Sequence, residues 1–331
     1  MDRDGVLAEA GIPLFDTKQP RAYDARQNLT TLVVTFATPT TTTNGDDMAG
    51  LEPWTLRGGV AVLTGAASGI GAALAVDLAR RGMQLALVDV DAAGLEASAA
   101  RARAIGVKVS THLMDVSDHA AVAALPAAVL AQHGRVTALI NNAGVALGGM
   151  FEQVAAEDFD WLMSINFGAA VRLTRAFLPV LAREPAAQLV NVSSIFGIIA
   201  PPGQTAYAAS KFAVRGFSES LRHELQMSGS KIGVTLVHPG GVRTAISENA
   251  RLAKGLDTSE VQRERANWRS LLVLDPAKAA QIIATGIERR TPRVLVGSDA
   301  KGAAIVQRLF PVTYWKHVAR DLARRIKRHP A

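Results

Sequence analysis

The fold is decided by one stretch, Val60-Ala61-Val62-Leu63-Thr64-Gly65-Ala66-Ala67-Ser68-Gly69-Ile70-Gly71. Its first four residues form a short apolar run, which predicts a buried β-strand. Residues 69–81 predict a helix that is closed by Gly82. The glycines between strand and helix let the backbone turn sharply, and the N-terminus of the helix offers free N–H groups to phosphates. A strand before and a helix after such a turn are typical of dinucleotide binding.

Strand-like and helix-like segments alternate along the rest of the chain. Apolar runs predict further strands at residues 84–88, 108–113, 138–140, 188–192, 233–238 and 293–296. Helices are expected between them at residues 92–105, 120–133, 158–183, 205–227 and 277–289. This alternation is typical of βαβ units with parallel strands. We therefore expect one α/β domain, a Rossmann-like, doubly wound parallel sheet of seven strands between two layers of helices.

Composition narrows the class of protein. The chain has 331 residues, of which 49% are hydrophobic, so it can bury a sizeable core. It contains no cysteine, which excludes disulfides, Cys-ligated zinc and a Cys nucleophile and is compatible with the cytoplasm. The seven histidines are scattered and form no zinc-protease motif, so we expect no metal site.

The two ends of the chain differ from its middle. We expect residues 1–55 to be a poorly ordered leader, because they hold a Thr-rich stretch at 38–43. Two alternatives stay open here: the apolar run at 32–36 forms a strand, or translation starts at Met48. The expected catalytic domain covers residues 56–300, and residues 301–331 form a basic, amphipathic, helical extension.

The basic charge of the chain is concentrated in that extension. Residues 314–331 hold six Lys and Arg against one Asp, a net +5 of the chain's total of +7. The remaining +2 gives little support to nucleic-acid binding. An apolar stripe at helical spacing runs through the same segment, formed by Trp315, Val318, Ala319, Leu322 and Ile326. It predicts either peripheral contact of residues 313–331 with an anionic membrane or docking of a terminal helix on protein.

An acidic residue follows the second strand of the expected sheet. At that position the carboxylate of Asp89 can accept hydrogen bonds from the ribose hydroxyls of a dinucleotide, and it repels a 2′-phosphate. No Lys or Arg follows directly, because the next residues are Val90 and Asp91. The site therefore favours NAD over NADP. The alternative is that Asp89 caps a helix.

A second constellation carries the chemistry of an acid/base. Tyr207 and Lys211 lie one helical turn apart, and Ser194 precedes them. A phenol is a poor base at neutral pH, and a neighbouring ammonium lowers its pKa by favouring the phenolate. Ser194 can donate a hydrogen bond to the same substrate oxygen.

Together these motifs resemble those of the short-chain dehydrogenase/reductase family, over residues 56–296. The matching motifs, in order, are Thr64-Gly65-x-x-x-Gly69-x-Gly71, Asp115-Val116, Asn141-Asn142-Ala143-Gly144, Asn166, Ser194, Tyr207-x-x-x-Lys211 and Pro239-Gly240. The resemblance implies an oxidoreductase in which Tyr207 is the general acid/base, Lys211 lowers its pKa, Ser194 polarises the carbonyl and Asn166 holds a water. Ser193 is a neighbouring alternative to Ser194.

The resemblance also implies which residues bind the dinucleotide. They are Gly65, Ser68, Gly69, Ile70, Gly71, Asp89, Asp115, Val116, Asn142, Ala143, Gly144, Tyr207, Lys211, Pro239, Gly240, Val242 and Thr244. The family commonly forms dimers or tetramers, and we expect helices 158–183 and 205–227 to carry that interface.

The expected reaction is hydride transfer between NAD(H) and a secondary alcohol or ketone. Apolar residues in the expected walls of the site, at 145–151, 195–204 and 245–274, favour a hydrophobic steroid-, retinoid- or fatty-type substrate. Phe151 and Trp268 would add aromatic area. Reduction of a 3-oxoacyl carrier or of a small diketone is the alternative, and a catalytically silent nucleotide-binding scaffold is the third.

Overall fold

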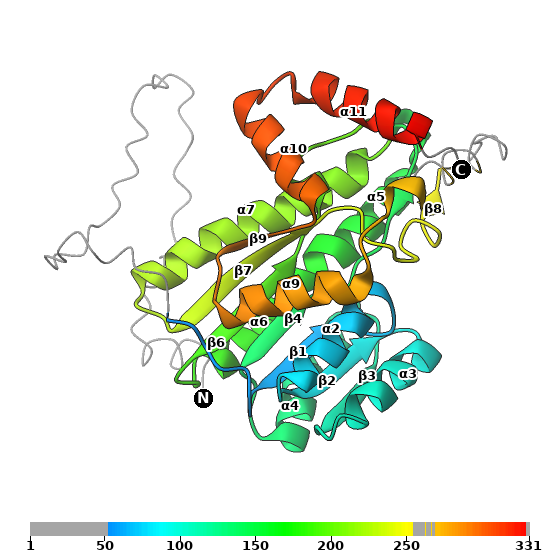
Figure 1. The fold of residues 1–331 in the computed structure, drawn as a ribbon. Coiled ribbons are helices and arrows are strands. Elements are labelled where there is room, and N and C mark those ends of the chain that lie inside the picture. The colour runs from blue at the N-terminus through cyan, green and yellow to red at the C-terminus, as the bar shows by residue number, and fades with distance from the viewer. Residues whose placement is uncertain (1–51, 254–261, 263–265, 267–268, 329–331) are drawn as a thin grey trace, which may run out of the picture. The chain divides into compact units, whose positions relative to one another are not determined.

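The computed structural model describes residues 52–253, 262, 266 and 269–328, and side chains up to residue 322 (Figure 1). Most of the expected leader, Met48, Trp268 and the side chain of Ile326 lie outside the described residues. The described residues belong to one compact unit, Gly50–Ala331.

Seven parallel strands form the sheet, in the order β3-β2-β1-β4-β6-β7-β9. Their bounds are β1 (Val60–Thr64), β2 (Gln84–Asp89), β3 (Val109–Leu113), β4 (Ala138–Asn141), β6 (Ala187–Val192), β7 (Ile232–Pro239) and β9 (Arg293–Val296). In the register, Val62 of β1 is paired with Ala86 of β2 on one side and Leu139 of β4 on the other. The strand order reverses between β1 and β4, and ligands bind at such a switch point. The expected sheet is confirmed.

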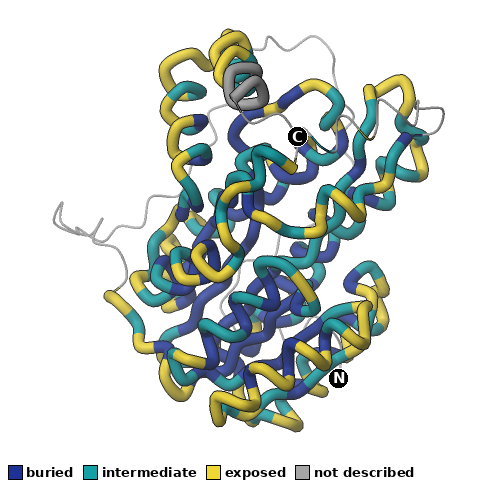
Figure 2. The backbone as a smooth tube through the Cα atoms, turned by 45° about the vertical axis from the view of Figure 1, so that its right-hand side comes forward, coloured by how far each residue is buried: buried dark blue, intermediate teal, exposed yellow. Residues whose placement is uncertain are grey.

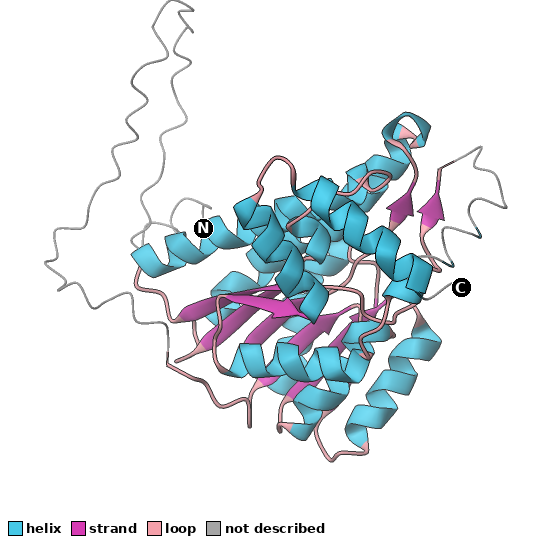
Figure 3. Ribbon diagram, turned by 45° about the horizontal axis from the view of Figure 1, so that its top comes forward, coloured by secondary structure: helices cyan, strands magenta, loops and turns pink. Residues whose placement is uncertain are grey.

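Helices cover both faces of this sheet (Figure 3). One core cluster joins the sheet to α2 (Gly69–Arg80), α3 (Ala92–Arg103) and α9 (Pro276–Glu288). The other cluster joins it to α4 (His119–His133), α6 (Ala169–Leu181) and α7 (Thr205–Met227). All residues of β1, β4, β6 and β7 are buried, and Figure 2 shows the central strands in dark blue. The continuous apolar runs in the sequence follow from this burial on both faces.

The expected long helix at residues 158–183 is interrupted. The structure has α5 (Ala156–Met163), a π-helical turn η2 (Ser164–Gly168) and then α6. A π-turn adds a residue to the helical repeat and is frequent at functional sites. The turn η2 places the buried Asn166 beside Val145, and the Asn166 side chain is hydrogen-bonded to the Val145 backbone. The hydrophobic pattern is too coarse to show a one-residue insertion.

A second, smaller sheet was not expected. It pairs β5 (Leu147–Gly148) with β8 (Arg251–Leu252) in parallel. The short helical turns η1 (Phe151–Gln153) and η3 (Ile195–Gly197) follow β5 and β6 in the chain. Two-residue strands are too short to produce a periodic pattern. The small sheet links two of the three segments that were expected to form the substrate walls.

The domain boundaries differ from those expected. The N–H group of Trp54 donates to the carbonyl of Glu288, and the Trp54 side chain packs against the core, so the folded domain begins before residue 56. At the other end, α10 (Ser298–Leu309) runs through the expected boundary at residue 300 and is followed by α11 (Tyr314–Arg328). None of the helices in the described part of the chain is both long and apolar enough to cross a membrane.

Candidate active site

The Gly-rich turn between β1 and α2 has a backbone that only glycine fits. Gly65 and Gly69 have φ angles of 67° and 53°, in the left-handed region. A Cβ atom at Gly71 would lie 1.9 Å from the carbonyl oxygen of Gly65. The absence of side chains therefore lets α2 begin directly against the end of β1.

The N-terminus of α2 is open to an anion. Its N-cap residue, Ser68, is exposed and makes no side-chain capping hydrogen bond, and the first turn contains no acidic residue. Free N–H groups and the positive end of the helix dipole therefore face outward at Ser68, Gly69 and Ile70. This arrangement fits the pyrophosphate of a dinucleotide.

The segment after β4 is fastened to the same turn. Thr64 Oγ1 accepts hydrogen bonds from the N–H groups of Asn142 and Ala143, both at 3.1 Å. The amide of Asn142 in turn donates to the carbonyls of Thr64 and Gly65, at 2.9 and 3.1 Å. The structure thus brings Asn142, Ala143 and Gly144 beside the Gly-rich turn at the switch point.

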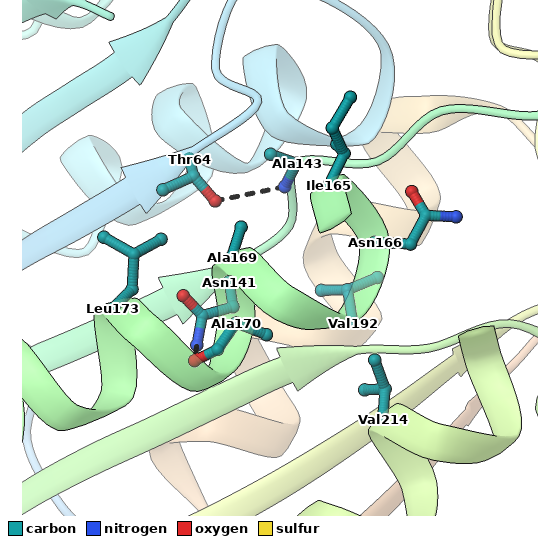
Figure 4. A pocket seen from close by; sticks show the side chains of 10 residues that line it. All are labelled: Thr64, Asn141, Ala143, Ile165, Asn166, Ala169, Ala170, Leu173, Val192 and Val214. Carbon is teal, nitrogen blue, oxygen red and sulfur yellow. Dashed lines mark hydrogen bonds between the residues drawn. The ribbon is translucent and has the colours of Figure 1, made fainter. Parts of the chain in front are cut away.

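A small internal cavity lies behind this segment (Figure 4). The residues that line it are Thr64, Asn141, Ala143, Ile165, Asn166, Ala169, Ala170, Leu173, Val192 and Val214. Asn141 faces this interior, where its amide donates to Asn191 Oδ1 at 2.8 Å. The cavity belongs to the core between β4, β6 and α6. Asn141 therefore lies in this core, behind the expected cofactor-binding segment Asn142–Gly144, and its role is structural.

The two acidic residues expected at the adenosine end lie at the carboxyl edge of the sheet. Asp89 accepts hydrogen bonds from the N–H groups of Ala67 at 2.9 Å and Val90 at 2.8 Å, so it links β2 to the Gly-rich turn. The helix-capping role belongs to Asp91, which caps α3. Asp115 is exposed and accepts from the N–H of Ser117 at 2.7 Å, and Val116 next to it is buried.

The segment after β7 lies against the Gly-rich turn. Thr244 Cγ2 lies 2.9 Å from the position that a Cβ atom at Gly69 would take, so this segment reaches the Gly-rich turn. Val242, in the same segment, is buried against the core of the domain. The segment from Pro239 to Thr244 is thus brought to the expected place beside α2.

Asp299 holds the middle of this segment and was not identified from the sequence. Its Oδ2 atom accepts a hydrogen bond from the N–H of Gly241 at 2.6 Å. A Cβ atom at Gly240 would lie 2.1 to 2.4 Å from the same carboxyl group, so only glycine fits there. Asp299 belongs to the first turn of α10, beyond the expected motifs, and no spacing in the sequence indicates its contact.

The four residues expected to be catalytic converge. Ser194 follows β6, Tyr207 and Lys211 lie on α7, and the Tyr207 side chain is hydrogen-bonded to Ser194. Lys211 Nζ lies 5.6 Å from the centroid of the Tyr207 ring and donates to the carbonyl of Val192 at 3.2 Å. A Cβ atom at Gly144 would lie 3.2 Å from Asn166 Oδ1 and 3.3 Å from Lys211 Nζ. The four residues therefore lie next to Gly144, in the segment expected to bind the dinucleotide.

Asn166 and Ser193 are both engaged with protein groups. The Asn166 side chain accepts from the Val145 N–H at 2.8 Å and donates to the Val145 carbonyl at 2.9 Å and to Ser210 Oγ at 3.1 Å. These contacts use both ends of its amide and fix the loop at Val145. Ser193 Oγ donates to the carbonyl of Lys211 at 2.9 Å. Ser194 is thus the serine that faces Tyr207.

The electrostatics of the pair differ from the expectation. Burial raises the pKa of the Tyr207 phenol above its ordinary value, while the hydrogen bond with Ser194 acts in the opposite direction. Burial also lowers the pKa of Lys211 to about 8. The structure does not show the expected lowering of the Tyr207 pKa by Lys211, whose Nζ atom lies 5.6 Å from the centroid of the phenol ring.

His238 supports the loop of Ser194, a role that its position in the sequence did not reveal. It is fully buried at the end of β7, and its Nδ1 atom lies 2.8 Å from the carbonyl oxygen of Ser194. Because a carbonyl only accepts, Nδ1 carries the proton of the neutral ring. Burial lowers the pKa of His238 to about 4.

This burial predicts a loss of stability in acid. Between pH 6.5 and about 4 the unfolded chain binds a proton at His238 that the folded chain does not, so the free energy of unfolding falls as pH decreases through that window. The contribution is on the order of 3 kcal/mol. We expect His238→Asn, whose amide can still donate to Ser194, to flatten the pH dependence of urea unfolding between pH 7 and 4. Equal pH slopes for variant and parent would contradict this.

The described parts of the three expected substrate walls contact one another. Residues 145–151 pair with the segment around residue 251 through β5 and β8, and the N–H of Gly149 donates to the carbonyl of Gly203 at 3.2 Å. Phe151 is 67% exposed at this rim. Ile198 and Ile199, however, are buried in a cluster with Ala303 of α10 and Tyr314 and Val318 of α11. These two isoleucines pack the C-terminal helices and do not line an open cleft.

Proteins of similar sequence are oxidoreductases. Residues 59–255 match the family model described as short chain dehydrogenase. A protein of Mycobacterium tuberculosis named as an oxidoreductase, SadH, is 41% identical over 270 residues, which cover 81% of this chain and 96% of that protein. The 3-oxoacyl-[acyl-carrier-protein] reductase FabG of Thermotoga maritima is 33% identical and covers 58% of this chain and 78% of its own.

Solved structures with the same fold include a complex with a dinucleotide. A short chain dehydrogenase/reductase from Burkholderia phymatum in complex with NAD superposes with a TM-score of 0.72 at 31% identity, covering 77% of this chain and 95% of that one. Levodione reductase superposes with a TM-score of 0.64 at 28% identity, covering 76% and 99%.

Proposed function

Because this chain belongs to the short-chain dehydrogenase/reductase family, we propose that it transfers a hydride between NAD(H) and a secondary alcohol or ketone, with Tyr207 as general acid/base. The observation that carries the proposal is the hydrogen-bonded pair of Ser194 and Tyr207, with Lys211 over the phenol ring, beside the Gly144 edge of the dinucleotide cradle.

The residues of the chain divide the work as follows. A bound nicotinamide accepts or supplies the hydride. Tyr207 takes the hydroxyl proton of the alcohol during oxidation and returns it to the carbonyl oxygen during reduction. Ser194 holds the same oxygen and stabilises the negative charge that develops on it. Lys211 carries positive charge over the phenol ring.

The cofactor in this proposal is NAD, because of the charge at Asp89. Its carboxylate lies at the end of β2 beside the Gly-rich turn, where it would repel a 2′-phosphate. We expect Asp89→Asn, which keeps an acceptor for the Ala67 N–H, to reduce the preference for NADH over NADPH at least about ten-fold in kcat/KM. Asp91→Asn is the matched control, since it removes a neighbouring charge outside the turn. Faster turnover of the parent with NADPH would contradict the proposal.

The proposed substrate is a hydrophobic alcohol or ketone of the steroid, retinoid or fatty type. Apolar side chains at the rim, such as Met150 and the exposed Phe151, support it. The alternatives remain a 3-oxoacyl carrier and a small diketone, and the likeness to FabG and to levodione reductase favours keeping both. A silent nucleotide-binding scaffold is the third alternative, and it predicts no turnover with any of these compounds.

A substrate panel tests the proposal. Apolar secondary alcohols of increasing size, a small diol and a 3-hydroxyacyl thioester would each be incubated with NAD⁺, and formation of NADH would be followed by absorbance. We expect the highest kcat/KM for the large apolar alcohols. A higher value for the thioester or the diol would select the corresponding alternative, and no NADH from any alcohol would overturn the proposal.

Two further expectations belong to this proposal. Assembly into a dimer or tetramer would use the outer faces of α7, which is the expected helix 205–227, and of α5 and α6, which stand in place of the expected helix 158–183. Localisation of the protein in the cytoplasm is compatible with a chain that contains no cysteine. Sedimentation equilibrium measures the first of these directly.

A further inference from the structure

Helix α10 presents its large apolar residues to the outside. Its buried face is made of small side chains, Ala300 and Ala303. On the opposite face Ile305 is 60% exposed and Leu309 66% exposed, and Val312, just beyond the helix, is 88% exposed. An ordinary surface helix does the reverse and turns its large apolar residues inward. The exposed side therefore has apolar area that the fold itself does not use.

The same face carries positive charge. Lys301 and Arg308 are exposed on α10, one turn away from Ile305 and beside Leu309. We call the surface formed by Lys301, Ile305, Arg308, Leu309 and Val312 the α10 outer face. Residues 298–331 contain eight Lys and Arg against two Asp, so this segment carries +6 of the chain's net +7.

The α10 outer face is held in a fixed orientation by α11. Tyr314 and Val318 of α11 pack against Ile198 and Ile199, and the Tyr314 hydroxyl accepts a hydrogen bond from the Ala200 N–H at 3.0 Å. Val318, one residue of the apolar stripe in α11, thus packs on protein, which agrees with the docking interpretation of the sequence. Figure 1 shows α10 and α11 as neighbours at the end of the domain that bears the C-terminus.

The positive charge of the α10 outer face favours an anionic lipid surface over a second copy of the chain as its partner. In a two-fold contact the face would meet its own copy, which would bring Lys301 and Arg308 of both copies together without acidic residues on the same face. An anionic lipid surface offers the complement: phosphate charge for the cations and acyl chains for Ile305, Leu309 and Val312. The combination of a basic rim and an apolar strip is that of interfacial helices.

We propose that the α10 outer face docks this protein on anionic lipid membranes. The proposal concerns a surface outside the catalytic residues, and it holds whichever alcohol or ketone is the substrate.

Co-sedimentation of the full chain with vesicles tests this proposal. Vesicles of phosphatidylcholine alone would be compared with vesicles of phosphatidylcholine and phosphatidylserine, at low and high salt. We expect binding to the anionic vesicles, weaker binding at high salt and little binding to the neutral ones. Arg308→Glu should weaken binding at least about five-fold, since one basic residue near an anionic surface contributes roughly 1 kcal/mol. The double variant Ile305→Ser/Leu309→Ser should weaken it at least about ten-fold.

Matched controls lie on other parts of the surface. Leu113→Ser changes a side chain that is 63% exposed at the end of β3, and Lys278→Glu reverses an exposed charge on α9. Both should bind vesicles like the parent. Equal sedimentation of parent and double variant, or no preference for anionic vesicles, would overturn the proposal. A double variant that instead changes the molar mass in analytical ultracentrifugation, with no vesicle binding by the parent, would assign the face to a second copy.

Discussion

Replacing Tyr207 with phenylalanine is expected to lower kcat by about 10²–10⁴-fold, the range that a positioned acid/base contributes. The ring would keep its packing against Phe196 and its place beneath Lys211, because both contacts involve the ring and not the hydroxyl. Only the proton carrier and the hydrogen bond to Ser194 would be lost. Initial rates of NADH formation at saturating alcohol measure the effect.

The same variant should still bind the dinucleotide. We expect the Kd for NADH, from fluorescence titration, to stay within about three-fold of the parent value, since the Gly-rich turn is unchanged. Tyr314→Phe is the matched control, because it removes a phenol hydroxyl that accepts from Ala200 but lies outside the catalytic group. Activity of Tyr207→Phe equal to that of the parent would remove Tyr207 from the reaction.

Gly71→Ala is expected to weaken dinucleotide binding at least about ten-fold and to destabilise the fold by about 1–3 kcal/mol. The new methyl group would lie 1.9 Å from the Gly65 carbonyl oxygen and 2.7 Å from Asn142 Nδ2. Because the first of these neighbours is backbone, α2 must move away from β1 to relieve the clash. The N–H groups at the start of α2 would then leave the place where the phosphates are held.

Fluorescence titration with NADH and urea unfolding measure these two effects. Gly302→Ala is the control, because a Cβ atom there meets nothing within 4 Å and the residue lies inside α10. It should leave NADH binding unchanged and raise stability by up to about 1 kcal/mol through its helix propensity. Parent-like NADH affinity in Gly71→Ala would show that the start of α2 does not hold the dinucleotide.

The sequence predicted most of the sheet but only part of the candidate site. Strand runs such as residues 60–63 and 233–238 are buried on both faces, so their hydrophobicity is continuous and the fold follows from it. Tyr207 and Lys211 were found because a helical repeat puts them on one face of α7. These features depend on local spacing alone.

The rest depends on contacts between distant parts of the chain. The hydrogen bond of Asp299 to Gly241 joins residues 58 positions apart, and His238 reaches the Ser194 loop from another strand. The direction of the Tyr207 pKa shift depends on how deeply the phenol is buried, which a motif does not contain. The π-turn at Ser164–Gly168 is a one-residue change of helical register, smaller than the hydrophobic pattern can resolve.

The contact of Asp299 with Gly241 affects when the loop after β7 can fold during synthesis. The family model ends at residue 255, yet the loop that closes the cofactor cleft is fastened by a carboxylate 44 residues further on. During synthesis residue 241 leaves the ribosome before residue 299. The nascent chain therefore cannot fix the loop at Gly241 in this way until residue 299 has left the ribosome.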